Sequence, residues 1–565
     1  MDDRKGWKQQ LRDIRDRMGA WATSWQGGPS EQGRAALPGA GSQGGSLAQE
    51  RYDDEGRSGI NARVPLRAEP LSTRDGRQQE KAISAGSVGE IKQPGDSPAV
   101  STGENRSASD SPALHRPKIK IRAPARTDWA GWQDVGRRTQ FDGTERADTL
   151  DLVIGLDFGT AFTKVIIGES RARYAVPFEQ RVATPNPYLL PGVLTIAADG
   201  ECHLGEVPDA QAYYSDMKFS LLAQDRTVER CALVAAYLAL VLRHVRAWFQ
   251  SNLGDVYGRN RINWLMNMGL PSDPWHDRQL KELYKQIAWA AWELSVAPGK
   301  VTLAAARDAY RTDPKGNFNG ASLRSPEQIS VIPEVIAQIA SYVRSPRRED
   351  DLHLLVDIGA GTVDVTTFNV HSEKGDDVYP IFAAKVLRLG THFLLNEILV
   401  STERPVEWDD SQPFPSVDVI VDRLRVDAAV LKGKMKKATS RFVGAIGDVL
   451  EKTKRNRYRR SPHWTDGIPV FICGGGANVP FYRNALGRLN RPTEYPMRVI
   501  QMERPNILKA PGLNATDFHR LSVAYGLSFD AFDIGRIRPI DDTPDDDPPP
   551  AGPSYTDAYV SKDLT

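Results

Sequence analysis

The stretch LDLVIGLDFGTAFTKVIIG, residues 150–168, decides how the rest of this sequence is interpreted. An apolar run reaches Asp157, a turn follows at Gly159 and Thr160, and a second apolar run begins at Val165. Two apolar runs joined by such a turn predict a β-hairpin. Small turn residues let a phosphate approach the backbone, whose N–H groups can donate to its oxygens. A carboxylate there would repel the phosphate, so Asp157 indicates a hard cation such as Mg²⁺ between the two.

A second stretch, DLHLLVDIGAGTVDVTTFNV at residues 351–370, repeats this order of strand, Asp, Gly, polar turn and strand. Asp357 lies 357 − 157 = 200 residues after Asp157. Either hairpin alone is most simply an ordinary tight turn in which Asp and Gly are turn formers. Two matching hairpins instead predict two similar lobes that face each other, with the hydroxyls of Thr160 and Thr362 as further phosphate donors.

A third stretch, VFICGGGANVPFYRNAL at residues 470–486, combines a buried strand with three glycines and with Pro480 near a helix start. Glycine lets a flat ring pack directly against the backbone. Alone, the three glycines indicate only a loop. Placed after two phosphate-type hairpins, they predict a nucleoside site.

The composition limits the other possibilities. The chain has 565 residues, with 73 Lys and Arg against 72 Asp and Glu, so no global field draws it to nucleic acid or anionic lipid. Three cysteines without CxxC spacing favour a reducing, cytoplasmic location. The longest apolar run, 231–242, is too short to span a bilayer. Strand-like and helix-like segments alternate over 150–537, which is typical of an α/β domain.

The segments outside this domain have a different composition. Three tryptophans on one face predict an amphipathic helix over 1–25, which could dock on a protein partner or a membrane surface, or fold back on the main domain. Residues 26–149 are predicted to be a disordered linker that includes a basic segment at 115–132. The acidic, Pro-rich residues 538–565 are predicted to be a disordered tail.

The three motifs, in this order and spacing, resemble the two phosphate motifs and the adenosine motif of the superfamily that joins actin, sugar kinases and the seventy-kilodalton heat-shock chaperones. Residues 331–343, VIPEVIAQIASYV, and 521–529, LSVAYGLSF, resemble its two connecting segments, and the similarity is greatest to the DnaK-type chaperone ATPase domain. The resemblance implies a two-lobed actin-like ATPase fold with duplicated ribonuclease-H-like cores over 150–537. It also implies ATP or ADP and Mg²⁺ as ligands.

The resemblance also implies roles for individual residues. Asp157, Asp357 and Asp364 would surround Mg²⁺ through water, Glu334 would help to orient the attacking water, and Lys218 would contact a phosphate. Without the resemblance, Lys218 is an ordinary surface lysine and Glu334 a solvated residue of a helix first turn. The nucleotide would lie against small and polar residues of the motifs, namely Gly159, Thr160, Ala161, Gly359, Gly361, Thr362, Lys432, Gly474, Gly475, Gly476 and Asn478.

Several positions depart from the superfamily pattern. Ala429 and Gly433 replace a Glu and an Arg that usually grip the adenosine, which leaves Lys432. Asn478 stands where an Arg often stacks on the adenine, and Ala161 replaces the second Thr of the usual GTT. Nucleotide affinity and base preference are therefore expected to be weaker or different.

These features predict a slow, Mg²⁺-dependent ATPase that acts as a nucleotide-driven switch on a protein partner, chaperone-like but without a peptide-binding domain. An actin-like filament-forming ATPase, a small-molecule kinase and a catalytically degenerate scaffold of the same fold are the alternatives. The basic run over 432–460 also admits nucleic-acid binding, although a solvated helix face is the commoner meaning of such a run. The sequence makes no statement about the oligomeric state.

Overall fold

The structure is a computed structural model, and it describes residues 129–141, 148–178, 186–207, 210–215, 217–222, 226–271, 277–312, 328–373, 376–399, 414–490 and 495–538. The predicted helix at 1–25 and the predicted tail beyond 538 lie outside the described residues, as does the linker up to residue 128. Within the predicted linker, however, Trp129–Arg137 forms helix α2. Trp132 of α2 is buried and its indole N–H donates to Nδ1 of His244 at 3.2 Å, so the prediction of disorder is wrong for this segment.

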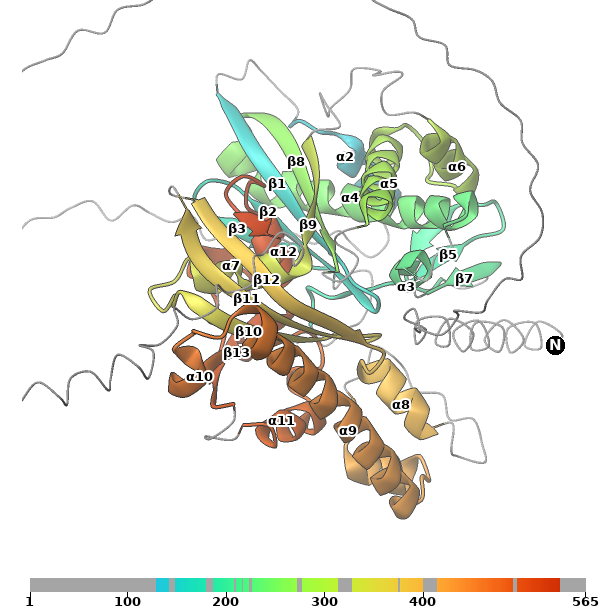
Figure 1. The fold of residues 1–565 in the computed structure, drawn as a ribbon. Coiled ribbons are helices and arrows are strands. Elements are labelled where there is room, and N and C mark those ends of the chain that lie inside the picture. The colour runs from blue at the N-terminus through green and yellow to red at the C-terminus, as the bar shows by residue number, and fades with distance from the viewer. Residues whose placement is uncertain are drawn as a thin grey trace, which may run out of the picture. The chain divides into compact units, whose positions relative to one another are not determined.

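The first sheet follows the order β15-β3-β2-β1-β8-β9 within the described residues, and β4 also pairs with β2 (Figure 1). β1, β2 and β3 are antiparallel neighbours, whereas β8 and β9 run parallel to β1. Its strands are β1 (Thr149–Phe158), β2 (Phe162–Gly168), β3 (Arg173–Ala175), β4 (Leu190–Pro191), β8 (Arg261–Leu270), β9 (Ile329–Pro333) and β15 (Leu508–Lys509).

The second sheet follows the order β14-β13-β10-β11-β12-β16 in the described part of the chain. β10, β11 and β12 are antiparallel neighbours, whereas β13 and β14 run parallel to β10, as β8 and β9 do to β1. Its strands are β10 (Asp351–Ile358), β11 (Val363–Glu373), β12 (Asp376–Leu387), β13 (Ile468–Cys473), β14 (Met497–Ile500) and β16 (Arg536–Arg538).

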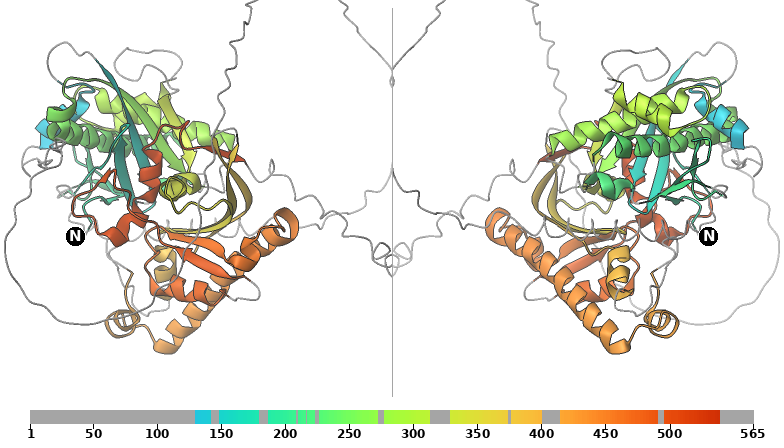
Figure 2. Two further views of the ribbon diagram at one scale, coloured as in Figure 1. Left: turned by 90° about the vertical axis from the view of Figure 1, so that its left-hand side faces the viewer. Right: turned by 90° about the vertical axis from the view of Figure 1, so that its right-hand side faces the viewer.

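Helices cover the outer faces of both sheets, so the predicted α/β class is confirmed (Figures 1 and 2). On the first sheet lie α2, α4 (Val228–Tyr257), α5 (Arg278–Val296) and α6 (Leu303–Arg311), beside a small sheet of β5 (Leu194–Ile196), β6 (Cys202–Leu204) and β7 (Ala212–Tyr214). On the second lie α8 (Thr391–Leu399), η3 (Val419–Arg423), α9 (Ala428–Lys452), η4 (Thr453–Arg457), α10 (His463–Asp466) and α11 (Pro480–Gly487).

The apolar run at 231–242 is part of α4, which has 30 residues. By length and composition α4 is the one helix in the described ranges that could cross a membrane, but 100% of its most apolar window is buried inside the protein. Its two buried arginines are held mainly by backbone carbonyls, and Nη1 of Arg246 is buried without a hydrogen-bond partner among the described residues. Arg243 and Arg246 donate to backbone carbonyls at the end of α5, including that of Ser295. α4 is thus held in place as a core helix.

Two helices, α7 (Glu334–Val343) and α12 (Ser522–Leu527), pack between the inner faces of the two sheets. They cross closely, because a Cβ on Gly526 would lie only 1.9 Å from the carbonyl oxygen of Ala337. A Cβ on Gly155 of β1 would likewise lie 2.4 Å from the carbonyl oxygen of Ala524. Glycine is therefore required at both contacts.

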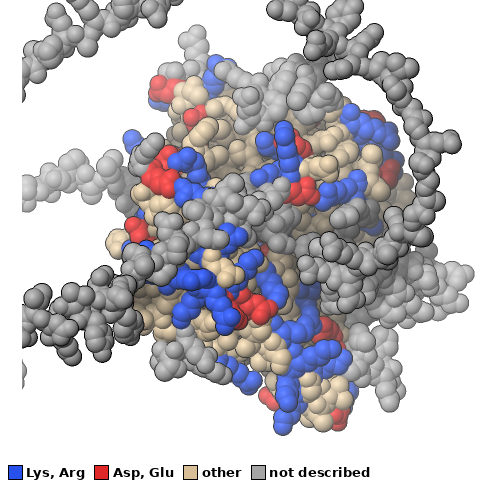
Figure 3. Space-filling view, in the orientation of Figure 1, with Lys and Arg blue, Asp and Glu red and all other residues tan. Residues whose placement is uncertain are grey.

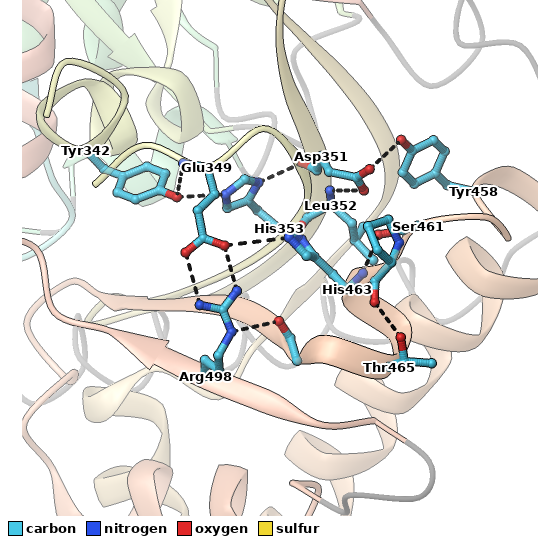
Figure 4. Close-up of polar contacts among 12 residues, drawn as sticks. Tyr342, Glu349, Asp351, Leu352, His353, Tyr458, Ser461, His463, Thr465 and Arg498 are labelled. Atoms are coloured by element: carbon cyan, nitrogen blue, oxygen red, sulfur yellow. Dashed lines mark hydrogen bonds and ion pairs between the residues drawn. The ribbon is translucent and has the colours of Figure 1, made fainter. Parts of the chain in front are cut away.

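The loop after α7 is fixed to the second sheet by a polar network (Figure 4). The hydroxyl of Tyr342 lies 3.1 Å from Nε2 of His353 and accepts the backbone N–H of Glu349. The carboxylate of Glu349 accepts two hydrogen bonds from the guanidinium of Arg498 on β14, at 3.0 and 2.7 Å. The start of α7, which carries Glu334, is thus part of a firmly anchored element.

Candidate functional site

A cavity of about 580 Å³ lies where the β1–β2 and β10–β11 hairpin turns approach each other. Its wall also includes the N-terminal end of α7, helix α3 (Met217–Leu222), the loop after β13 and the helical turn η5 (Ala515–Arg520). All five predicted catalytic residues line it, namely Asp157, Lys218, Glu334, Asp357 and Asp364. The fold therefore brings together residues that are up to 207 positions apart (364 − 157 = 207).

The two hairpins close with the same hydrogen bond. The N–H of Gly159 donates to the carbonyl of Phe162 at 3.2 Å, and the N–H of Gly359 donates to that of Thr362 at 2.9 Å. The turns also face each other, since a Cβ on Gly361 would lie 3.8 Å from Oγ1 of Thr160. Backbone and hydroxyl donors of both turns consequently border one space.

The strand register sets one charged pair across each hairpin. Asp157 lies opposite Lys164, and Asp357 lies opposite Asp364. In the first hairpin the carboxylate Oδ2 of Asp157 is 2.9 Å from Nζ of Lys164, and both side chains are largely buried. The second hairpin has two carboxylates instead. The first hairpin is thus internally neutralised, whereas the second presents an excess of negative charge.

The Oδ1 atoms of Asp357 and Asp364 are both buried without a hydrogen-bond partner among the described residues. Burial, followed by the charge of Glu334, raises the pKa of Asp357 to about 6. Burial, followed by the charge of Asp357, raises the pKa of Asp364 to about 8. The two carboxyl groups therefore resist ionising together unless a cation joins them.

A second ion pair spans the cavity wall. The ammonium of Lys218, at the start of α3, contacts Oε1 of Glu334, the first residue of α7. Burial lowers the pKa of Lys218, but the attraction of Glu334 and of further acidic neighbours outweighs this and raises it. The pKa of Glu334 is also raised, by burial and by Asp157 against the opposing effect of Lys218. Asp157 thus contributes to both upward pKa shifts, after Glu334 in the case of Lys218 and after burial in the case of Glu334.

The acidic residues fit Mg²⁺ held mainly through water. The described residues contain no group of three His, Cys, Asp or Glu side chains that could enclose a metal ion. The two unpartnered carboxylate oxygens of Asp357 and Asp364 nevertheless offer hydrogen-bond acceptors to metal-bound water. Mg²⁺ usually keeps several waters and takes its remaining ligands from one or two carboxylates and substrate phosphates. The donor set therefore agrees with Mg²⁺ that arrives together with a phosphate compound.

The three-glycine loop approaches the second hairpin closely. Gly474 has φ of +77°, and a Cβ there would lie 2.3 Å from Oδ1 of Asp357. Gly475 also lines the cavity, whereas a Cβ on Gly476 would collide with Cγ2 of Ile358 at 2.2 Å. Asn478 lines the cavity and accepts a hydrogen bond from Nη2 of Arg483 at 3.0 Å. Gly476 thus serves the packing of the loop, while Gly474, Gly475 and Asn478 border the space.

The remaining predicted residues divide into two groups. Gly159, Thr160, Ala161, Gly359, Gly361 and Thr362 line the cavity. Lys432 is exposed on α9 and is outside the lining, where Met435, three residues later on the same helix, is found instead. The rotation of α9 therefore turns an apolar side chain, and not Lys432, toward the cavity.

The lining includes residues that the sequence analysis does not predict, and three of them carry polar side chains next to predicted ones. Lys164 pairs with Asp157, Gln338 lies one turn after Glu334, and Arg520 approaches Gly475 with Nη2 at 3.8 Å from the Cβ position. Lys164 could have been found from the hairpin register, because a turn closed between Gly159 and Phe162 places it opposite Asp157. Gln338 could have been found from helical spacing. Arg520 precedes the segment 521–529, and no sequence pattern indicates that it lies at the site.

Comparisons with known proteins do not identify the function of this site. No known protein family and no curated protein matches the chain. A solved structure of MreB 5 of Spiroplasma citri bound to AMPPNP aligns with 66% of this chain and 94% of its own, at 16% sequence identity and a TM-score of 0.35. These values are too low to carry a functional assignment, so the function is inferred from the cavity.

Proposed function

We propose that this chain is a Mg²⁺-dependent ATP-binding protein with a two-lobed, actin-like fold, and that it hydrolyses ATP slowly as a conformational switch. One observation carries the proposal. Two hairpin turns with the same Gly-to-carbonyl hydrogen bond, at 3.2 and 2.9 Å, face each other across a cavity that is also lined by five acidic residues. The matching strand arrangements of the two sheets support a duplicated core of the ribonuclease-H-like type.

The phosphates would lie between the two turns. Each turn offers backbone N–H groups and one hydroxyl, from Thr160 or Thr362. Lys164 and Lys218 supply positive charge at the acidic end of the cavity. Asp357 and Asp364 would hold Mg²⁺ through water, and the ion would neutralise the charge of the transferred phosphate when bound.

Glu334 is the residue best placed to orient an attacking water. It lines the cavity at the N-terminal end of α7, and Lys218 fixes the position of its carboxylate. Its raised pKa makes the carboxylate a better proton acceptor than an ordinary glutamate. Gln338, one helical turn away, donates a hydrogen bond that lowers the pKa of Asp357 and so favours its ionised form.

The switch would act through the relative placement of the two sheets. The turns come from different sheets, and the inner faces of both sheets pack on α7 and α12. A ligand that contacts both turns stabilises the arrangement in which they face each other. A protein partner would bind the two arrangements of the sheets with different affinity, and the amphipathic segment 1–25 is a candidate docking site for it. A chaperone-like action in the cytoplasm remains part of this proposal.

Recognition of the base is expected to be weak. Lys432 lies outside the cavity, and the lining there is apolar, with Met435, Phe414 and Phe481. Apolar surfaces hold a purine by stacking and burial, but they do not distinguish its exocyclic groups. We therefore expect ATP and GTP to bind with similar affinity.

The test is calorimetric titration with Mg²⁺-ATP together with phosphate release, for the wild type, Asp357→Ala and Asp448→Ala. Asp448, an exposed residue of α9 that pairs with Lys385, is the matched control. We expect the wild type and Asp448→Ala to bind Mg²⁺-ATP and to hydrolyse it slowly, and we expect Asp357→Ala to abolish this turnover. Binding without turnover would reduce the site to a nucleotide-sensing scaffold, and no binding at millimolar ATP would overturn the proposal. Sedimentation with and without ATP detects filament formation.

A further inference from the structure

Six basic side chains gather where α9 ends and η4 begins, and we call this group the basic patch. In the ten residues 451–460 there are six basic residues and one acidic residue, a net charge of 6 − 1 = +5. Figure 3 shows basic side chains collected over the region where α9 ends beside β12 in Figure 1. The patch consists of Lys452, Lys454, Arg455, Arg457, Arg459 and Arg460.

The basic patch has a fixed platform. Tyr458, in its middle, stacks on Phe382 of β12 with ring centroids 4.6 Å apart and planes 12° apart. The hydroxyl of Tyr458 donates to Oδ2 of Asp351 at 3.1 Å, and its carbonyl accepts the indole N–H of Trp464 at 2.8 Å. Within the patch, the guanidinium of Arg459 donates to the carbonyl of Arg455. The positive charges are therefore held at defined positions on the surface.

Two residues of the basic patch make contacts at the surface of the described fold. Arg455 pairs with Glu451 at 2.8 Å, but both side chains are largely exposed. Lys454 lies over the rings of Trp464 and Tyr495, at 5.2 and 5.5 Å. Surface pairs of this kind contribute little, and a concentration of like charge destabilises the folded state. A polyanionic occupant would offset that repulsion.

The end of the described chain leads toward this patch. β16 pairs in parallel with β12, so that Arg538 lies opposite Pro380, two residues before Phe382. Because the two strands are parallel, β16 runs along β12 in the direction of Phe382. The chain therefore leaves Arg538 beside the strand that carries the platform of the basic patch.

The sequence that follows Arg538 has the complementary charge. Residues 541–547, DDTPDDD, contain five aspartates and no basic residue, a charge of −5 against the +5 of 451–460. Only two residues separate Arg538 from this segment, and nine extended residues reach about 30 Å. Such a short connection gives an effective concentration on the order of millimolar.

We propose that the acidic segment 541–547 binds the basic patch of the same chain and covers a polyanion-binding surface. The contact is electrostatic, because prolines and aspartates bring little apolar surface. It therefore opens at raised ionic strength, as screening shortens the range of the charges to about 10 Å at 0.1 M salt and about 3 Å at 1 M. The device is independent of the nucleotide site proposed above.

Carbodiimide cross-linking of the full chain, read by peptide mass spectrometry, tests the contact directly. It joins lysine amines to carboxylates, so bonds are expected from Lys452 or Lys454 to the aspartates of 541–547 at low salt, and they should disappear at 1 M salt. A mixture of ¹⁴N- and ¹⁵N-labelled protein separates bonds within one chain from bonds between chains. Bonds that form only between chains, or none, would overturn the proposal.

Polyanion binding tests the consequence. A full-length variant with all five aspartates of 541–547 changed to Asn should bind a fluorescent single-stranded DNA 20-mer at least about ten-fold more tightly than the wild type at low salt. The matched control, Asp557→Asn with Asp563→Asn, removes tail charges outside this segment and should bind like the wild type. Adding Arg455→Gln, Arg457→Gln and Arg459→Gln to the five-Asn variant should abolish the gain. If the wild type and the five-Asn variant bind the DNA equally, the proposal is wrong. Equal and tight binding would show that the patch is a nucleic-acid surface.

Discussion

The ammonium of Lys164 lies 2.9 Å from the carboxylate of Asp157, in the cross-strand position that Asp364 occupies opposite Asp357 in the other hairpin. Two hairpins of the same shape therefore carry opposite charge at one equivalent position. The first hairpin is suited to the direct approach of a phosphate, and the second to a cation. This division assigns the two turns different tasks in the proposed site.

Lys164→Met should weaken Mg²⁺-ATP binding by about ten-fold or more. The change leaves the largely buried Asp157 without its cation, so an incoming phosphate meets an uncompensated negative charge. Calorimetric titration measures the effect. Lys385→Met is the matched control, since it breaks an exposed ion pair with Asp448 away from the cavity, and equal binding by the two variants would contradict the assignment.

Asp364→Asn should raise the thermal stability of the ligand-free protein at pH 8 while abolishing Mg²⁺-dependent turnover. The pKa of Asp364 is raised from 3.8 to about 8, so its ionisation destabilises the fold. This cost is absent below pH 3.8, grows as the pH rises and is complete above about 8. We expect a gain of several degrees in Tm at pH 8 that shrinks toward pH 5.

The control for this prediction is Asp448→Asn, because Asp448 is exposed and paired with Lys385. Its Tm should follow that of the wild type across the same pH range. Calorimetric scans between pH 5 and 8 decide the matter. A Tm of Asp364→Asn that stays at or below the wild-type value at pH 8 would show that burial of this carboxylate carries no cost.

Gly474→Ala should abolish nucleotide binding and destabilise the fold by about 1–3 kcal/mol. The residue has φ of +77°, and a Cβ would lie 2.3 Å from Oδ1 of Asp357. Gly444→Ala is the matched control, because Gly444 is exposed on α9 and its Cβ would meet nothing within 4 Å. Urea unfolding should show that Gly444→Ala gains about 0.5–1 kcal/mol. Equal effects of the two changes would refute the close approach of the glycine loop.

Much of the site could be predicted because its chemistry is local in sequence. Each hairpin combines a strand pattern, an Asp and a small turn within twenty residues, and the strand period decides which side chains share a face. Asp157, Asp357 and Asp364 therefore lie at the cavity, as the sequence predicts. The α/β class follows from the same alternation of strand and helix patterns.

The errors concern properties that no local pattern encodes. The resemblance predicts that Lys432 contacts the nucleotide. The rotation of α9, however, depends on how its apolar face packs against the second sheet, and that packing brings Met435 to the cavity. Helix α2 lies within residues 26–149, whose composition predicts a disordered linker. Its Trp132 finds a partner in His244, which is 112 residues away. Both outcomes depend on tertiary contacts.

Acid should destabilise the protein through His353. Its ring is fully buried, Nδ1 donates to the carbonyl of Asp351 at 2.8 Å, and Nε2 accepts the hydroxyl of Tyr342 at 3.1 Å (Figure 4). Burial lowers the pKa of His353 from 6.5 to about 4. The resulting stability is fully present above pH 6.5 and is lost as the pH falls toward 4, by about 3 kcal/mol in total.

Urea midpoints measured from pH 7 to pH 4 test this prediction on the wild type, His353→Gln and His371→Gln. The neutral amide of His353→Gln cannot take up a proton, so this variant should be less stable at pH 7 but should lose less on acidification. His371 is half-buried on β11 with Glu373 as its partner at 2.9 Å, and its replacement should leave the acid-induced loss in place. If His353→Gln loses as much stability as the wild type between pH 6.5 and 4, other groups cause the acid sensitivity and the buried ring does not.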